Sequence, residues 1–208
     1  MRRVGLGLAA IMVVLLGACT TPTSSPSADP TDPSGYHGAA LPDPYDMPDA
    51  TLTDTSGRPY NLRTSPSKPV TLVFFGYSHC PDVCVGVLSD VATALSRTRP
   101  GVRDQVQTIF VTTDPARDTP PVLRTYLSRF DPSFLGLTGD FSTIKKVADR
   151  IGVDIEPASK LPGGGYEVGH SAQVIGFDRR HQGVVLWTPG TPIADLRQDF
   201  ELLVAQQQ

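Results

Sequence analysis

The chain has 208 residues, of which 39% are hydrophobic and 19% are charged, and its formal net charge of −3 fits one ordinary globular domain with short appendages. With 18 basic against 21 acidic residues it lacks the cationic excess of a nucleic-acid-binding protein, and three cysteines are too few for a disulfide-dense scaffold. No apolar segment reaches the roughly 20 residues that a membrane-spanning helix needs, which excludes a polytopic membrane protein.

The first 18 residues have the pattern of an export signal. Arg2 and Arg3 precede a short apolar run that ends in Leu-Gly-Ala-Cys19, and these are the charged region, apolar region and small residues of a cleaved signal. The last four residues resemble the lipobox of bacterial lipoproteins, in which the cysteine becomes the first residue and carries a lipid. We therefore expect residues 1–18 to be removed and Cys19 to anchor the chain on the extracytoplasmic face of the cell membrane. A plain secretory signal or an uncleaved anchor is the alternative.

Residues 19–48 predict a disordered tether behind the lipidated cysteine. Few apolar residues lie in this stretch, so it cannot bury enough surface to offset the entropy lost on ordering. Its prolines are Pro22, Pro26, Pro30, Pro33, Pro42, Pro44 and Pro48. A flexible linker of about 25 residues has an r.m.s. reach of roughly 25–30 Å. The folded domain, residues 49–208, could then stand off the membrane.

From residue 49 onward the pattern predicts alternating strands and helices. A turn at 54–59 indicates an opening β-hairpin, and the continuous β-branched and aromatic run at 69–76 is typical of a strand buried on both faces. Helical spacing of apolar residues and further apolar runs predict the remaining elements. They are helices over 84–95, 120–130, 141–151 and 192–203, strands over 106–111, 134–137, 172–177 and 184–187, and a Gly- and Pro-rich loop over 156–169. Such alternation predicts an α/β fold.

The sharpest chemical feature is the cysteine pair Cys80 and Cys84, which lies where the buried strand gives way to a helix. Residues four apart on a helix have Cβ atoms about 5–6 Å apart, so both sulfurs can meet one metal ion or form a disulfide. The helix N-terminus favours thiolate over thiol, as metal ligation and thiol exchange require. A purely structural disulfide is the alternative, although closing so short a loop removes little chain entropy.

A metal site needs a ligand besides two thiolates, and the chain has four histidines. His37 falls in the expected tether, His79 points away from its neighbour Cys80 if the segment is extended, and His181 lies in a turn between two strands. His170 follows the Gly-rich loop and precedes a strand, so it can project over a sheet edge. Two thiolates and an imidazole suit Cu(I), with Zn(II) as the alternative.

Four motifs follow one another along the chain: FGYSHCPDVC at 75–84, TDPARDTP at 113–120, LGLTG at 135–139 and HS at 170–171. Together they resemble the motifs of the Sco/SenC family of copper-binding proteins, and the resemblance covers roughly residues 50–205. It implies a thioredoxin-like α/β fold, with a central mixed sheet flanked by helices and an N-terminal hairpin.

The resemblance also implies a function. One copper ion, as Cu(I) with Cu(II) as a further option, would be bound by Cys80, Cys84 and His170. The family is associated with delivering copper to the dinuclear copper centre of cytochrome c oxidase, or with reducing the cysteines of that centre. Family members commonly have an aspartate before the histidine, where this chain has Gly169. Asp114 is a candidate to take its place beside the site.

Two functions stay open from the sequence. The first is a monomeric, membrane-anchored copper chaperone that serves the copper-bearing oxidase subunit or another exported copper protein. The second is a thiol–disulfide reductase in which Cys80 attacks and Cys84 resolves. Thioredoxin-type oxidoreductases have a cis-proline facing the cysteines, and no proline lies between Pro162 and Pro189, which favours metal binding. A peroxiredoxin is disfavoured because its Pro-x₃-Thr-x₂-Cys motif does not precede Cys80.

Overall fold

The structure is a computed structural model that describes residues 34–81 and 83–208. The expected signal segment, Cys19 and the first part of the tether lie outside these residues. Within the described ranges, no helix is long and apolar enough to cross a membrane.

A mixed eight-stranded sheet forms the centre of the domain, in the order β1-β10-β9-β4-β5-β6-β2-β3. The three central strands β4, β5 and β6 are parallel, and the flanking pairs are antiparallel. Every residue of β4 is buried, as its unbroken apolar run predicts. The strands are β1 (Ala39–Asp46), β2 (Thr51–Asp54), β3 (Pro59–Asn61), β4 (Val70–Gly76), β5 (Val106–Thr112), β6 (Leu135–Thr138), β9 (Val174–Phe177) and β10 (Gln182–Trp187).

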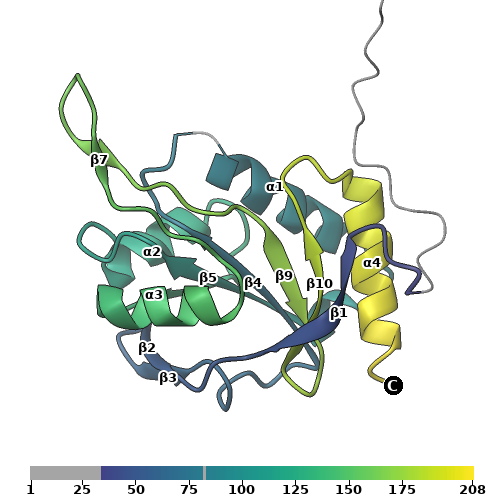
Figure 1. The fold of residues 1–208 in the computed structure, drawn as a ribbon. Helices are drawn as coiled ribbons and strands as arrows, with labels where there is room; N and C mark the ends of the chain where they lie inside the picture. The colour runs from purple at the N-terminus through teal and green to yellow at the C-terminus, as the bar shows by residue number, and fades with distance from the viewer. Residues whose placement is uncertain (1–33, 82) are drawn as a thin grey trace, which may run out of the picture.

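Four helices cover the sheet in the described part of the chain: α1 (Val83–Ser96), α2 (Pro120–Leu127), α3 (Phe141–Arg150) and α4 (Ile193–Ala205). Helices α1 and α4 pack against each other, and α2 packs on β6 (Figure 1). Asp140 caps α3 by accepting a hydrogen bond from the Thr143 N–H, as a carboxylate at this position is expected to do. The short strands β7 (Ser159–Lys160) and β8 (Tyr166–Glu167) form a narrow hairpin that projects from the body (Figure 1).

This arrangement confirms the thioredoxin-like fold and the opening hairpin that the sequence predicts. Strands β2 and β3 pair antiparallel around the expected turn, and each predicted helix and central strand is present within a few residues of its predicted bounds. The loop expected at 156–169 contains the small β7–β8 hairpin.

The predicted end of the tether at residue 48 is wrong. Residues 39–46 form the edge strand β1, which pairs with β10, and Tyr36 and Met47 are buried in the core. An edge strand tolerates prolines because one side has no partner strand to bond, and the pairing of β1 is irregular between Ala40 and Tyr45, around its two prolines. The folded domain therefore includes the described residues 34–48.

The prediction that His37 lies in a disordered tether is also wrong, because His37 belongs to this ordered segment. We call residues 34–47 the N-terminal strap. Asp199 of α4 is 1% exposed and accepts hydrogen bonds from the backbone N–H groups of His37 and Gly38 and from the Trp187 indole N–H. The His37 ring lies 2.9 Å from the same carboxylate. Gly38 is required here, since a Cβ would lie 2.5 Å from the Trp187 ring. One buried carboxylate thus fastens the strap to the domain.

Candidate metal centre

The two cysteines flank the start of α1 at the carboxyl end of β4. Cys80 lies in the turn that follows the strand, where its N–H donates to the Tyr77 carbonyl at 3.1 Å. Cys84 lies in the first turn of the helix and is fully buried. Gly76 leaves room for it, because a Cβ at position 76 would lie 2.9 Å from the Cys84 Sγ. The strand-to-helix junction therefore brings both thiols to one end of the sheet.

His170 reaches the same end of the sheet from the segment between β8 and β9. It forms an isolated antiparallel bridge with Ile155, and its ring packs edge-on against Phe74 and Tyr77, at 6.3 and 6.0 Å between ring centres. Its Nδ1 lies 3.0 Å from the Ser171 carbonyl oxygen. Because a carbonyl oxygen only accepts, Nδ1 carries the proton and Nε2 keeps the lone pair that a metal needs.

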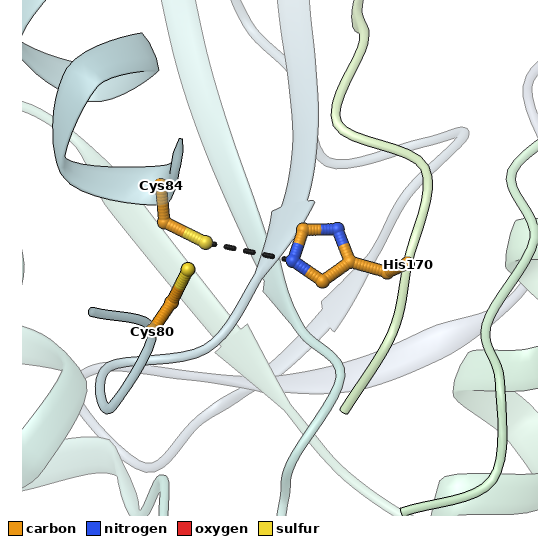
Figure 2. Close-up of side chains that lie close together, drawn as sticks. All are labelled: Cys80, Cys84 and His170. Carbon is orange, nitrogen blue, oxygen red and sulfur yellow. Dashed lines mark hydrogen bonds between the residues drawn. The ribbon is translucent and has the colours of Figure 1, made fainter. Parts of the chain in front are cut away.

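The three predicted ligand residues converge, as Figure 2 shows. The Cys84 Sγ lies 3.5 Å from the His170 Nε2. One ligand atom from each of Cys80, Cys84 and His170 lies within 4.8 Å of the others, and neither cysteine is in a disulfide. A metal held by thiolates at about 2.3 Å and imidazole at about 2.0 Å separates its ligand atoms by roughly 3.5–4 Å. The observed spacing is compatible with such an ion.

The electrostatics of the pair differ from the sequence expectation that the helix N-terminus favours thiolates. The pKa of Cys84 is raised above its ordinary value, first by its hydrogen bond with Cys80 and then by burial, with the Asp118 carboxylate adding to the effect. A hydrogen bond from the Tyr77 backbone opposes the rise without cancelling it. In the metal-free protein Cys84 is therefore a thiol, and a bound cation must displace its proton.

Asp118 is a residue of the site region that sequence reasoning did not single out. It is fully buried and accepts hydrogen bonds from the Ser78 N–H at 3.0 Å, the Ser78 hydroxyl and the Thr112 hydroxyl at 2.6 Å. Ser78 is two residues before Cys80, so this carboxylate holds the cysteine turn in place. Asp118 lies within the TDPARDTP motif at 113–120, but a motif of neighbouring residues does not identify a partner 40 residues earlier.

Asp114, the candidate to lie beside the site, is buried and does not bond to His170 directly. Its carboxylate pairs with Arg117 and accepts a hydrogen bond from the Tyr166 hydroxyl at 2.8 Å. Tyr166 belongs to the segment that leads to His170. Within the described residues, the connection from Asp114 to His170 thus passes through other side chains.

A different carboxylate lies over Gly169, the residue before His170. Glu156 faces Gly169 on the paired segment, and its N–H donates to the Gly169 carbonyl at 2.8 Å. A Cβ at position 169 would overlap with the Glu156 carboxylate. The space that an aspartate side chain at 169 would enter is therefore already filled by an acidic group from the neighbouring segment.

The remaining histidines do not join the cysteines. The ring of His79 lies 3.0 Å from the Ser78 hydroxyl and is exposed, and His37 binds Asp199 on the strap. His181 occupies the turn between β9 and β10 with a φ of 60°. Among the described residues, only Cys80, Cys84 and His170 form a group with metal-ligand spacing.

Fold and site together define a thioredoxin-like protein with two thiols and one imidazole gathered at the end of its sheet. The SCO1/SenC family model matches residues 44–205, and the chain belongs to this family. The protein named SCO2, mitochondrial, of Saccharomyces cerevisiae is 36% identical over 137 residues, which is 65% of this chain and 44% of that protein. The chain spans between 44% and 65% of the length of the first curated relatives it matches.

Solved structures agree with this membership. The structure of Bradyrhizobium japonicum ScoI with copper bound has a TM-score of 0.65 and 32% identity, and the match covers 80% of this chain and 98% of that one. The crystal structure of yeast Sco1 has a TM-score of 0.68 and 29% identity, covering 81% of this chain and 98% of that one. The fold is therefore shared over about four fifths of this chain and nearly the whole length of the two solved structures.

Proposed function

We propose that this protein is a copper metallochaperone that binds one copper ion through Cys80, Cys84 and His170. The observation that carries the proposal is the convergence of two thiols and one imidazole within 4.8 Å. Soft thiolate ligands with an imidazole suit Cu(I) better than hard cations. The similar ScoI of Bradyrhizobium japonicum has copper bound, which supports copper over zinc, with Cu(II) as a second valence of the cargo.

A three-ligand site also suits transfer of the ion. His170 is half-buried and Cys80 is slightly exposed, so one side of the group is open to an incoming ligand. Copper binding releases the thiol proton of Cys84, and departure of the ion returns it. Each donor that leaves the ion is replaced by one from the acceptor, so the copper need not pass through free solution.

We further propose that the chain works at the extracytoplasmic face of the cell membrane. Residues 1–18 would be removed, Cys19 would carry the lipid, and the residues between Cys19 and the strap would form the tether. An anchored carrier meets a membrane-bound client at a raised effective concentration. Family membership supports the copper-bearing subunit of cytochrome c oxidase as the client, with another exported copper protein as the alternative.

The arrangement of the cysteine pair supports thiol–disulfide reduction as a second candidate function. Cys80 and Cys84 are both in the reduced form and hydrogen-bonded to each other, so they can close a disulfide with little movement. The thiolate of Cys80, the more exposed of the two, would attack a client disulfide and release one client thiolate. Cys84 would then displace the second. The client gains two electrons, and the pair is left as a disulfide.

The deciding experiment is a Cu(I) titration of the reduced protein against a Cu(I)-selective chelator. We expect one equivalent to bind, and the affinity to fall by at least about tenfold in His170→Ala because a direct ligand is lost. His181→Ala is the matched control and should bind like the wild type. An unchanged Cu(I) affinity in His170→Ala would rule out the three-ligand chaperone. Rapid reduction of a client disulfide peptide, abolished in Cys80→Ser, would then establish the reductase.

A further inference from the structure

A cluster of charged and aromatic side chains lies next to His170, between the loop after β5 and the segment that carries the histidine. The Arg117 guanidinium lies 3.8 Å from the centre of the Tyr166 ring and 5.7 Å from that of Tyr77, within the range of cation–π contacts. It also donates to the Tyr166 carbonyl at 3.3 Å and pairs with Asp114. One side chain thus joins two tyrosines from different segments.

Asp114 closes this cluster. Its carboxylate is 4% exposed, and it binds the Arg117 guanidinium and the Tyr166 hydroxyl at the same time. The Arg117 side chain is itself only 25% exposed. In such a shielded pair, loss of one partner leaves the other charge without compensation, which is more costly than loss of a surface ion pair. Breaking the cluster is therefore costly.

The two tyrosines are linked to His170 in different ways, Tyr77 by ring contact and Tyr166 through the chain. The Tyr77 ring supports the histidine directly, with its plane at 84° to the imidazole and 6.0 Å between centres. Tyr166 lies four residues before the histidine in β8. The projecting hairpin is held at its base by two backbone hydrogen bonds, Glu156 N–H to Gly169 and Ser171 N–H to Asp154. Arg117 thus contacts both the segment that carries His170 and the Tyr77 ring that packs against the imidazole.

We propose that Arg117 is a positioning residue for His170: by clamping Tyr166 and Tyr77, it keeps the imidazole aimed at Cys80 and Cys84. This inference rests on the proposed copper site. A ligand on a projecting segment loses freedom when it binds a metal, and a segment that is already held in place reduces that cost. Arginine is suited to the position because its planar group stacks on rings while its donors bind a carboxylate, which lysine does not reproduce.

A double-mutant cycle with Cu(I) tests the proposal on the full reduced protein. We expect Arg117→Met to weaken Cu(I) binding about threefold to tenfold, with Arg117→Lys giving little rescue. Arg97→Met, at an exposed position near the end of α1, is the matched control and should have no effect. In the His170→Ala background, Arg117→Met should cause no additional loss, since it acts through the histidine. Equal losses in both backgrounds would overturn the clamp.

A second measurement uses the metal-free protein, so it does not depend on copper binding. In Arg117→Met, hydrogen exchange at the Glu156 and Ser171 amides should be at least about fivefold faster than in wild type, because the hairpin base opens more often. Exchange in β4 should be unchanged, which separates loosening of the hairpin from global unfolding. Unchanged exchange at the hairpin base would refute the clamp. Wild-type protein that binds no Cu(I) would instead refute the proposed function.

Discussion

Two buried aspartates, one in α4 and one in the loop between β5 and α2, both accept several hydrogen bonds but serve different purposes. Asp199 accepts hydrogen bonds from the N–H groups of His37, Gly38 and Trp187 and so holds the N-terminal strap against the domain. Asp118 accepts hydrogen bonds from the N–H and hydroxyl of Ser78 and from the Thr112 hydroxyl, and so holds the turn that carries Cys80. In each case one carboxylate satisfies several donors that come from segments distant in sequence.

The two aspartates differ in the titratable groups that their carboxylates affect. The strap aspartate helps to raise the pKa values of two residues of the strap, His37 and Tyr36, so its effect is on the stability of the strap. The Asp118 charge also reaches the thiol pair, where it contributes to the raised pKa of Cys84. Among the residues that the structure describes, neither carboxylate pairs with a lysine or arginine; Asp199 stabilises the strap, whereas Asp118 also affects the chemistry of the thiols. Changes at the two positions should accordingly be separable.

The largest expected effect is on stability, from Asp199→Ala. The change leaves the N–H groups of His37, Gly38 and Trp187 without their acceptor, and each buried donor left unsatisfied costs about 1–3 kcal/mol. We expect a loss of about 3 kcal/mol in the free energy of unfolding, measured by urea denaturation. Asp195→Ala, which removes a partly exposed carboxylate 4.0 Å from the His37 ring, should cost far less. A drop in Cu(I) affinity of the folded variant would contradict the separation.

Asp118→Ala should affect both stability and metal binding. We expect it to lower the free energy of unfolding by about 2 kcal/mol, because Ser78 and Thr112 lose their acceptor. Cu(I) affinity should fall about tenfold as the Cys80 turn loosens, as seen in the chelator titration. Asp131→Ala is the matched control, since Asp131 is also buried and hydrogen-bonded but bonds to Arg103 and Ser133. It should lose similar stability with unchanged affinity.

The smallest effect is a pH dependence at the strap. The pKa of His37 is raised from 6.5, first by its hydrogen bond to Asp199, so the folded protein binds this proton more tightly than the unfolded chain. The stabilisation is complete below pH 6.5 and is lost as the pH rises through the raised value. Since the ring is about one third exposed, we expect only about 0.5 kcal/mol. Unfolding curves of wild type and His37→Gln at pH 5.5 and 8.5 measure it, and identical pH dependence in both would refute the assignment.

Local patterns were enough to predict most of the fold and the cysteine pair, whereas the choice of His170 as the third candidate ligand came from the family resemblance. The unbroken apolar run of β4, the helical spacing after Cys84 and the turn of the opening hairpin each depend on residues close in sequence. The strap was missed for the same reason. Its proline-rich composition averages to that of a linker. Its ordering depends on a few contacts: Tyr36 and His37 bond to α4 and the residue after it, and Met47 bonds to the turn before β10.

The sequence by itself determined the alternation of strands and helices and the placing of two thiols at one strand-to-helix junction, because these follow from short-range periodicity and spacing. Only the tertiary structure decided which histidine meets the thiols, since His170 is 86 residues from Cys84 and joins it through the pairing of β4 with β9. It also decided the supports, Asp118 beneath the cysteine turn and Arg117 beside the histidine. Such pairs are selected by chain topology and packing, and neither leaves a signal in local composition.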